Sequence, residues 1–133
     1  MPPEASFGFT KLVVDDLERM AAFYQQVYGL HAVNRVRGER IGDEEIDEIM
    51  LSPDPEAAYG SLVLLEYPNR GPSPNGELIL GFTTSDLPAL LERVREAGGG
   101  VHAPIKEMPE LRLRVAFATD PEGHLAELVQ LLV

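Results

Sequence analysis

Residues 12–30, LVVDDLERMAAFYQQVYGL, decide the fold that the sequence predicts. The β-branched start is typical of a strand, and Asp15, three residues before Glu18, makes a capping-box pattern at the head of a helix. The apolar residues that follow have the spacing of a single helix face: Leu17, Met20, Ala21, Tyr24, Val27 and Tyr28. Gly29 then provides a left-handed stop. The stretch therefore predicts a strand that leads into an amphipathic helix of about three turns.

The same order of residues returns 70 positions later, in residues 82–100, FTTSDLPALLERVREAGGG. Ser85 or Asp86 can cap this second helix, and three glycines follow its last apolar residue. β-branched and aromatic runs between turn formers predict strands at 7–14, 30–37, 46–51, 61–67, 78–84, 101–107, 111–119 and 125–132. The chain is therefore predicted to be a duplication of a β-α-β-β-β unit.

A segment rich in proline, glycine and asparagine separates the two repeats. We expect module one at residues 5–68, a linker at 69–76 and module two at 77–133, all within a single domain of residues 1–133. Neither repeat could bury its sheet and its helix alone. The predicted fold class is α+β, with two tandem β-α-β-β-β modules forming a cupped eight-stranded mixed sheet and two helices on the outer face. Such a cup is a default ligand site.

The composition excludes several classes of protein. Apolar residues make up 44% of the chain and charged residues 25%, which is typical of a globular rather than a disordered protein. The net charge of -11 would repel a phosphate backbone, so nucleic acid is not an expected partner. Cysteine is absent, which excludes disulfides and suits a reducing, cytoplasmic location. No segment has the pattern of a membrane span or an ordinary signal peptide, so no membrane partner is expected.

Three motifs together form a familiar pattern. VDDLER at 14–19 is followed by a helix with Phe-Tyr, the second helix ends in Ala-Gly-Gly at 97–99, and DPEGH at 120–124 leads to Glu-Leu at 127–128. The pattern resembles the glyoxalase, bleomycin-resistance protein and extradiol dioxygenase superfamily, also called the vicinal oxygen chelate fold. The resemblance covers essentially the whole chain and is specific for the fold rather than for a reaction. Because relatives commonly dimerise, it also implies a homodimer.

Enzymes of this family usually hold a divalent metal, such as Zn, Ni, Mn or Fe, on the inner face of the cup. The resemblance places the four ligand positions at Phe9, Leu64, Ile79 and Glu127. Only Glu127 carries a donor atom, because hydrocarbon side chains cannot coordinate a cation. We therefore expect a degenerate metal site and no resident cofactor, with a divalent metal on Glu127 as the alternative.

A shifted alignment leaves a second possibility open. It would bring Glu66 or Glu77 beside Glu127 and make an all-carboxylate site, which suits a hard ion such as Mg²⁺ or Mn²⁺. The simpler interpretation of Glu66 and Glu77 is that they are polar members of half-exposed strands.

The candidate site follows from these positions and from strand alternation, because residues two apart share a face. Its catalytic residue is Glu127, and its substrate-binding residues are Phe9, Lys11, Leu64, Ile79 and Phe117. Lys11 is included because it shares a face with Phe9, and Phe117 because relatives place a pocket residue there. Glu127 can act as a general base, or it can be a structural carboxylate paired with Lys11 across the cup, and both interpretations stay open.

Other polar residues receive a structural interpretation. His31, His102 and His124 fall on no ligand position and are expected to be partly exposed. The acidic residues between 43 and 48 are expected to form a solvated surface.

The leading functional hypothesis is a glyoxalase-like enzyme of the lyase or isomerase type, which transfers a proton beside a carbonyl of a small organic molecule bound in an apolar cup. The alternative is a non-catalytic binding protein similar to bleomycin-resistance proteins. The acidic net charge would favour a cationic ligand for such a protein. A dioxygenase is a weaker fit, because its chemistry needs two histidines and a carboxylate on iron.

Overall fold

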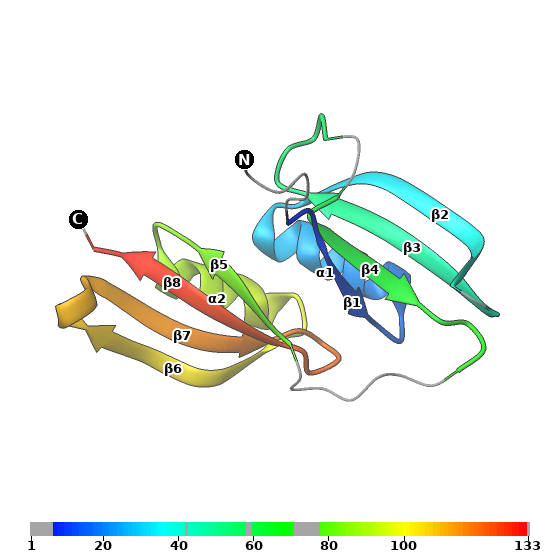
Figure 1. The fold of residues 1–133 in the computed structure, drawn as a ribbon. Coiled ribbons are helices and arrows are strands. Elements are labelled where there is room, and N and C mark those ends of the chain that lie inside the picture. The colour runs from blue at the N-terminus through cyan, green and yellow to red at the C-terminus, as the bar shows by residue number, and fades with distance from the viewer. Residues whose placement is uncertain (1–6, 42, 58–59, 71–77, 133) are drawn as a thin grey trace. The chain divides into compact units, whose positions relative to one another are not determined.

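A computed structural model describes residues 7–41, 43–57, 60–70 and 78–132 of the 133-residue chain. These residues form two α-helices, a short 3-10 helix and eight strands (Figure 1). The α+β class and the tandem β-α-β-β-β order are confirmed, with the strands in two four-stranded mixed sheets. Neither helix has the length and apolarity needed to cross a membrane. Most of the predicted linker, residues 71–76, lies outside the described residues.

The first module contains β1 (Thr10–Val13), α1 (Leu17–Tyr28), β2 (His31–Ile41), β3 (Glu44–Ser52) and β4 (Leu62–Glu66). Its strand order is β1-β4-β3-β2, where β1 runs parallel to β4 and the other neighbours are antiparallel.

The second module repeats this topology. It contains β5 (Ile79–Thr83), α2 (Leu87–Glu96), β6 (Gly100–Met108), the 3-10 helix η1 (Pro109–Leu111), β7 (Leu113–Thr119) and β8 (Leu125–Leu131). The strand order is β5-β8-β7-β6, again with one parallel pair, β5 and β8.

The helix ends follow local sequence signals. The Asp86 carboxylate accepts a hydrogen bond of 3.1 Å from the backbone N–H of Ala89, which confirms one of the two predicted caps of α2. In α1 the cap is Asp16, which accepts from the N–H of Arg19 at 3.2 Å. The predicted cap at Asp15 is therefore one residue early. Gly29, with φ of 69°, follows α1 as expected.

The chain divides into two compact units. The first comprises Met1–Ala21 and Leu30–Pro72, and the second comprises Ala22–Gly29 and Ser73–Val133. The boundary falls within α1, so that the second half of this helix belongs with the second sheet.

One face of the second sheet is covered by α2, as the ribbon in Figure 1 shows. The helix buries Leu87, Leu90, Leu91 and Val94. The buried sheet residues on this side are Ala116, Ala118, Ala126 and Leu128. The alternate residues of β8 are only half-buried, which leaves the opposite face of the sheet open.

Candidate functional site

The open face of the second sheet carries Glu127 at its centre. Glu127 in β8 lies opposite Gly81 in β5 and opposite Phe117 in β7. The next row along the strands consists of Ile79, Leu125 and Thr119. Paired residues of neighbouring strands point to the same side of a sheet. The strand register thus places Ile79, Phe117 and Glu127 on one face, as the sequence predicted. Their roles stay predictions.

The surroundings of Glu127 are mainly apolar. Phe117 stands on one side of the carboxylate, and Gly81 presents no side chain on the other. Among the described residues of this face, Glu127 is the one carboxylate. A carboxylate in this position can accept a proton from a bound molecule, and the hydrocarbon around it can hold an organic substrate.

The first unit holds a charged pair that the sequence did not predict. The Lys11 Nζ donates a hydrogen bond of 2.5 Å to Glu48, whose side chain is only 6% exposed. The Phe9 ring centroid lies 5.8 Å from the same Nζ, so the expected proximity of Phe9 and Lys11 is found. The interpretation of Glu48 as part of a solvated acidic surface is wrong, because β3 buries it. Lys11 thus has its carboxylate partner within its own unit.

Leu64 does not lie beside Lys11. It pairs with Leu12, which is buried, whereas Lys11 pairs with Val63. Leu64 itself is fully buried. The strand register therefore places Leu64 on the face of Leu12 and Val63 on the face of Lys11, and the substrate-binding role of Leu64 stays a prediction.

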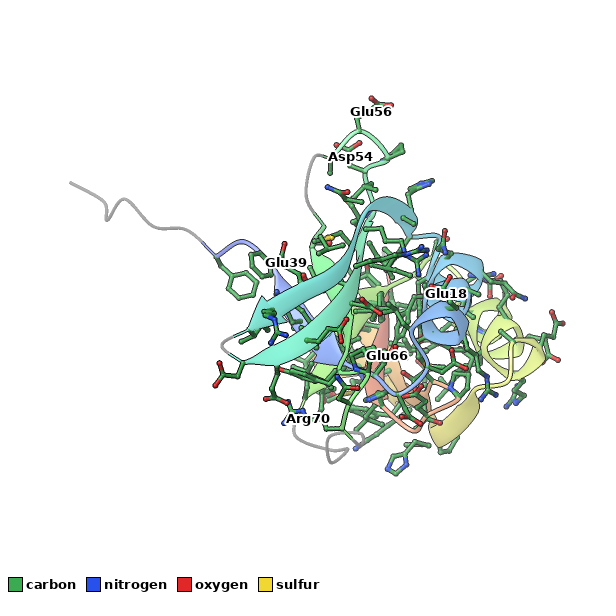
Figure 2. The ribbon with its side chains drawn as sticks, turned by 90° about the vertical axis from the view of Figure 1, so that its right-hand side faces the viewer. Glu18, Glu39, Asp54, Glu56, Glu66 and Arg70 are labelled. Carbon is green, nitrogen blue, oxygen red and sulfur yellow. The ribbon has the colours of Figure 1, made fainter. Side chains whose placement is uncertain are left out.

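Of the two carboxylates of the shifted alignment, Glu66 lies on the face of its sheet opposite Lys11. Glu66, labelled in Figure 2, accepts a hydrogen bond of 3.3 Å from the backbone N–H of Leu17 at the start of α1. It pairs across the strands with Asp47 and shares the Leu64 side of β4. Glu77 lies outside the described residues.

The second unit contains a buried polar network around Asp120. Its carboxylate accepts hydrogen bonds from the Tyr24 hydroxyl at 2.9 Å and from the backbone N–H groups of Glu122 and His124, both at 2.9 Å. The Nδ1 atom of His124 lies 2.7 Å from the same carboxylate. His124 is therefore a buried structural residue, not a partly exposed one as expected, while His31 and His102 are exposed.

The pKa values in this network follow from burial and hydrogen bonding. Burial alone would raise the pKa of Asp120, but the hydrogen bonds from His124 and Tyr24 and the charge of His124 hold that pKa below its ordinary value of 3.8. Burial and the neighbouring Asp120 raise the pKa of Tyr24 far above its usual range. Tyr24 thus stays protonated and acts as a donor.

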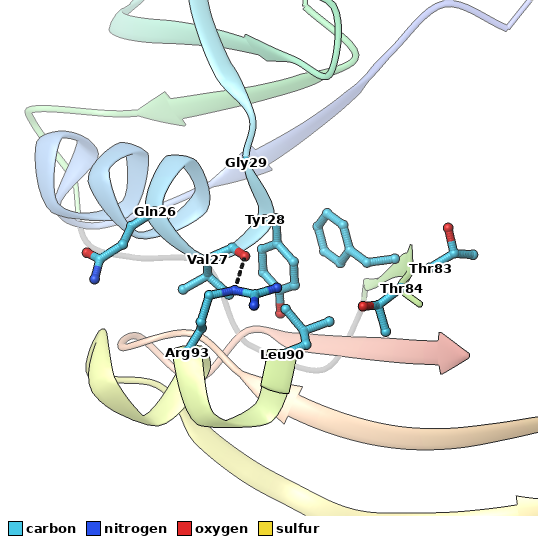
Figure 3. Close-up of a pocket in the computed structure, with 9 residues that line it drawn as sticks. Gln26, Val27, Tyr28, Gly29, Thr83, Thr84, Leu90 and Arg93 are labelled. Atoms are coloured by element: carbon cyan, nitrogen blue, oxygen red, sulfur yellow. Dashed lines mark hydrogen bonds between the residues drawn. The ribbon is translucent and has the colours of Figure 1, made fainter. Parts of the chain in front are cut away.

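A pocket of about 340 Å³ lies at the C-terminal end of α1 in the second unit (Figure 3). The Arg93 Nε donates a hydrogen bond of 3.4 Å to the backbone oxygen of Val27, drawn as the dashed line in Figure 3. The Tyr28 and Phe82 rings stack with centroids 3.7 Å apart. Arg93 thereby caps the negative end of the helix. The described lining includes none of the predicted site residues.

The residues at the implied ligand positions do not fit a divalent metal. Phe9, Leu64 and Ile79 carry no donor atom, and neither does Val63, which pairs with Lys11. The cross-strand neighbours of Glu127 offer none either. Within the described residues, no three side chains of His, Asp or Glu gather closely enough to hold an ion.

Known proteins share this sequence pattern and fold. A family model described as the Glyoxalase/Bleomycin resistance protein/Dioxygenase superfamily matches residues 6–128. A lactoylglutathione lyase of Arabidopsis thaliana is 33% identical over 88% of this chain, which spans 41% of that relative. A lactoylglutathione lyase of Pseudomonas aeruginosa is 27% identical, over 96% of this chain and 83% of its own length.

The fold has a solved counterpart in a glyoxalase family protein from Bacillus cereus. The two share a TM-score of 0.79 at 19% identity, over 95% of this chain and 93% of that one. At this identity the likeness shows the fold alone. The family match covers nearly all of the chain, and the chain therefore belongs to the glyoxalase/bleomycin resistance protein/dioxygenase superfamily.

Proposed function

We propose that the chain is a glyoxalase-like enzyme of the lyase or isomerase type, in which Glu127 moves a proton beside a carbonyl of a small organic substrate. The observation that carries the proposal is the position of Glu127, a single carboxylate between Phe117 and Gly81 on a largely apolar sheet face. The names of the curated relatives support a substrate of this kind.

The chemical step needs only a base and a carbonyl. The Glu127 carboxylate accepts the proton of a C–H bond next to the carbonyl, and the electron pair of that bond moves toward the carbonyl oxygen. The same carboxyl group then returns the proton to either carbon of the resulting enediolate. Return of the proton to the carbon that lost it restores the substrate, whereas return to the other carbon gives the isomer only when the hydroxyl proton also passes to the former carbonyl oxygen. Phe117 and Leu125 would contact the carbon skeleton of the substrate.

The compound in the relatives' name provides a probe. Lactoylglutathione is a 2-hydroxy thioester, and it therefore has a C–H bond beside a carbonyl. We expect the protein to exchange this hydrogen for deuterium in D₂O, measured by NMR. Glu127→Gln should lower the exchange rate by roughly 100-fold or more, because a positioned general base contributes at least this factor.

Glu107→Gln is the matched control for this experiment. Glu107 lies on β6 of the same sheet, pairs with Arg114 and is not part of the open face. The control should exchange like the unchanged protein. Exchange that survives in Glu127→Gln would contradict the proposal. Binding of the probe without exchange in either protein would replace it with the non-catalytic, bleomycin-resistance-like alternative.

A single domain, a homodimer and a cytoplasmic location belong to the same proposal. Ile79 and Leu131 are 54% and 62% exposed, and exposed apolar side chains of this size support an assembly. The absence of cysteine is compatible with a reducing compartment. A monomer mass in light scattering would contradict the homodimer.

A further inference from the structure

Gly81 occupies the middle of β5, directly opposite Glu127. Glycine weakens the interior of a strand, because it has no side chain to pack and loses more conformational freedom than other residues. The neighbouring positions of β5 are Leu80 and Phe82, which are ordinary strand residues. A glycine in the middle of β5 therefore calls for an explanation in its backbone conformation, in its packing or in its function.

The backbone gives no such reason. Gly81 is not among the glycines with positive φ, so its conformation is open to any residue. The pairing of β5 with β8 is continuous from Ile79 to Thr83, and Gly81 does not sit at a bulge.

Packing within the chain gives no reason either. A Cβ atom built on Gly81 meets no atom within 4 Å. Two other glycines show the contrast: a Cβ on Gly60 would lie 2.7 Å from the backbone of Leu51, and one on Gly99 would lie 2.4 Å from the oxygen of Thr119. Those two glycines permit close packing, whereas Gly81 borders open space.

A glycine in a regular strand also marks a place where a ligand approaches the backbone closely. We propose that Gly81 is a specificity-determining residue, which keeps a gap beside Glu127 for the flat carbonyl end of the substrate. The inference rests on the proposed function of Glu127. Neighbouring strands are about 4.8 Å apart, so a branched side chain at 81 would fill the space that a substrate carbon needs next to the carboxylate.

The substrate class follows from this gap. The part of the molecule that reaches Glu127 is small, as in a short 2-hydroxy carbonyl compound, and its flat carbonyl group lies directly on the β5 backbone. The bulkier, apolar part of the substrate contacts Phe117 on the other side of the carboxylate. A carbonyl compound branched next to its reacting carbon is excluded by this arrangement.

The test is a size series, Gly81→Ala and Gly81→Val, in the full chain. We expect Gly81→Val to unfold at a higher temperature than the unchanged protein, because valine favours strands and the site has room for it. The same variant should lose roughly 10-fold or more in the deuterium exchange rate of lactoylglutathione, since a small misplacement at the reacting atoms is enough for such a loss. The exchange rate of Gly81→Ala should lie between those of the unchanged protein and Gly81→Val.

Thr83→Val is the matched control. Thr83 lies on the same face of β5 but opposite Val129, one row away from Glu127. The Thr83→Val substitution adds no bulk beside the Glu127 carboxylate and should leave the deuterium exchange rate unchanged.

The outcomes separate this inference from the proposed function. If Gly81→Val folds and exchanges at the unchanged rate while Glu127→Gln does not exchange, the gap has no role and only this inference fails. An unchanged protein that neither binds nor exchanges the probe would overturn both. A change of molar mass in Gly81→Val, with exchange retained, would show that the gap receives a neighbouring chain and would also overturn the inference.

Discussion

The pair of Lys11 and Glu48 is the clearest residue-level feature that the sequence did not reveal. Glu48 belongs to an acidic run in which Glu44 is exposed and Glu45 and Asp47 are half-buried, so local composition predicts a solvated residue. Its burial depends on β4, which pairs with the β3 segment from Asp47 to Leu51. A buried carboxylate needs a partner, and Lys11 supplies it from β1.

We predict an asymmetric cost when this pair is broken. Lys11→Met leaves Glu48 buried without a cation and should destabilise the protein by about 2 kcal/mol at neutral pH. Glu48→Gln should cost only about 1 kcal/mol, because Lys11 is 32% exposed and can turn its ammonium group to water. The double variant should be more stable than Lys11→Met alone. Urea unfolding followed by circular dichroism measures all three, and single variants that unfold like the unchanged protein would show that the pair contributes nothing.

The family resemblance supplied the positions of Glu127, Phe117 and Leu64, and the strand register places Glu127 and Phe117 together on one face. On β8, buried and half-buried residues alternate from Leu125 to Val129, and this pattern identifies the face. The β4 segment Leu62–Leu65 is apolar and buried throughout, so no alternation indicates which residues face α1. The parallel register with β1 supplies that information, and it exists only in the folded chain.

At the level of elements, the Asp120 side chain stabilises the turn between β7 and β8, in addition to the turn-forming Pro121 and Gly123. The carboxylate fixes the turn through backbone N–H groups and also binds Tyr24 of α1. This turn leads directly into β8, the strand that carries Glu127. The DPEGH motif is therefore a support for the site and for the second half of α1.

The lowered pKa of Asp120 predicts how stability depends on pH. A carboxyl group with a depressed pKa in the folded state stabilises the protein above its ordinary value of 3.8, and it loses this contribution as the pH falls toward the folded value. The unchanged protein should therefore have a larger free energy of unfolding than the Asp120→Asn variant, most clearly above pH 3.8. This difference between the two proteins should shrink in more acidic solution.

The control for this experiment is Asp43→Asn, which removes an exposed carboxylate from the β2–β3 hairpin. Its stability should follow the pH dependence of the unchanged protein. Denaturant unfolding at a series of pH values gives the comparison. A constant difference between the unchanged protein and Asp120→Asn at every pH would contradict the assignment.

The sequence predicted the elements well where hydrophobic periodicity marks them. Helix α2 begins directly after Asp86, one of its two predicted caps, and α1 begins one residue later than a cap at Asp15 would place it. The end of β2 was missed, because the strand continues to Ile41 through a polar hairpin. There the strand is held by cross-strand pairs such as Arg40 with Glu45, and a bulge near Gly38 interrupts the alternation.

For the molecule as a whole, the internal duplication is the feature that the sequence showed most directly. The two helix starts are separated by the predicted shift, and the two sheets have the same strand order. The division of α1 between the units could not be predicted. Met20 and Tyr24 lie on one apolar stripe, and a stripe indicates burial without telling which sheet covers each residue.

The metal dependence of the whole protein provides the last prediction. Phe9, Val63 and Ile79 cannot replace the donors that a divalent ion needs, and Glu127 alone would bind one weakly. We expect that dialysis against a chelator leaves the unfolding temperature and the deuterium exchange rate unchanged. Added Ni²⁺, Mn²⁺ or Zn²⁺ should raise neither, because a ligand stabilises the folded state only when its concentration exceeds its dissociation constant.

Elemental analysis of the chain purified without a chelator or affinity tag completes this experiment. One tightly held equivalent of metal, lost together with activity on chelation and restored by one ion, would contradict the prediction. Glu127→Gln and Glu77→Gln would then identify the source of the donors. Loss of the metal in both variants would assign the site to Glu127 and to the segment before β5, where Glu77 lies outside the described residues. Retention in both would place the ion elsewhere and leave Glu127 as a metal-free base.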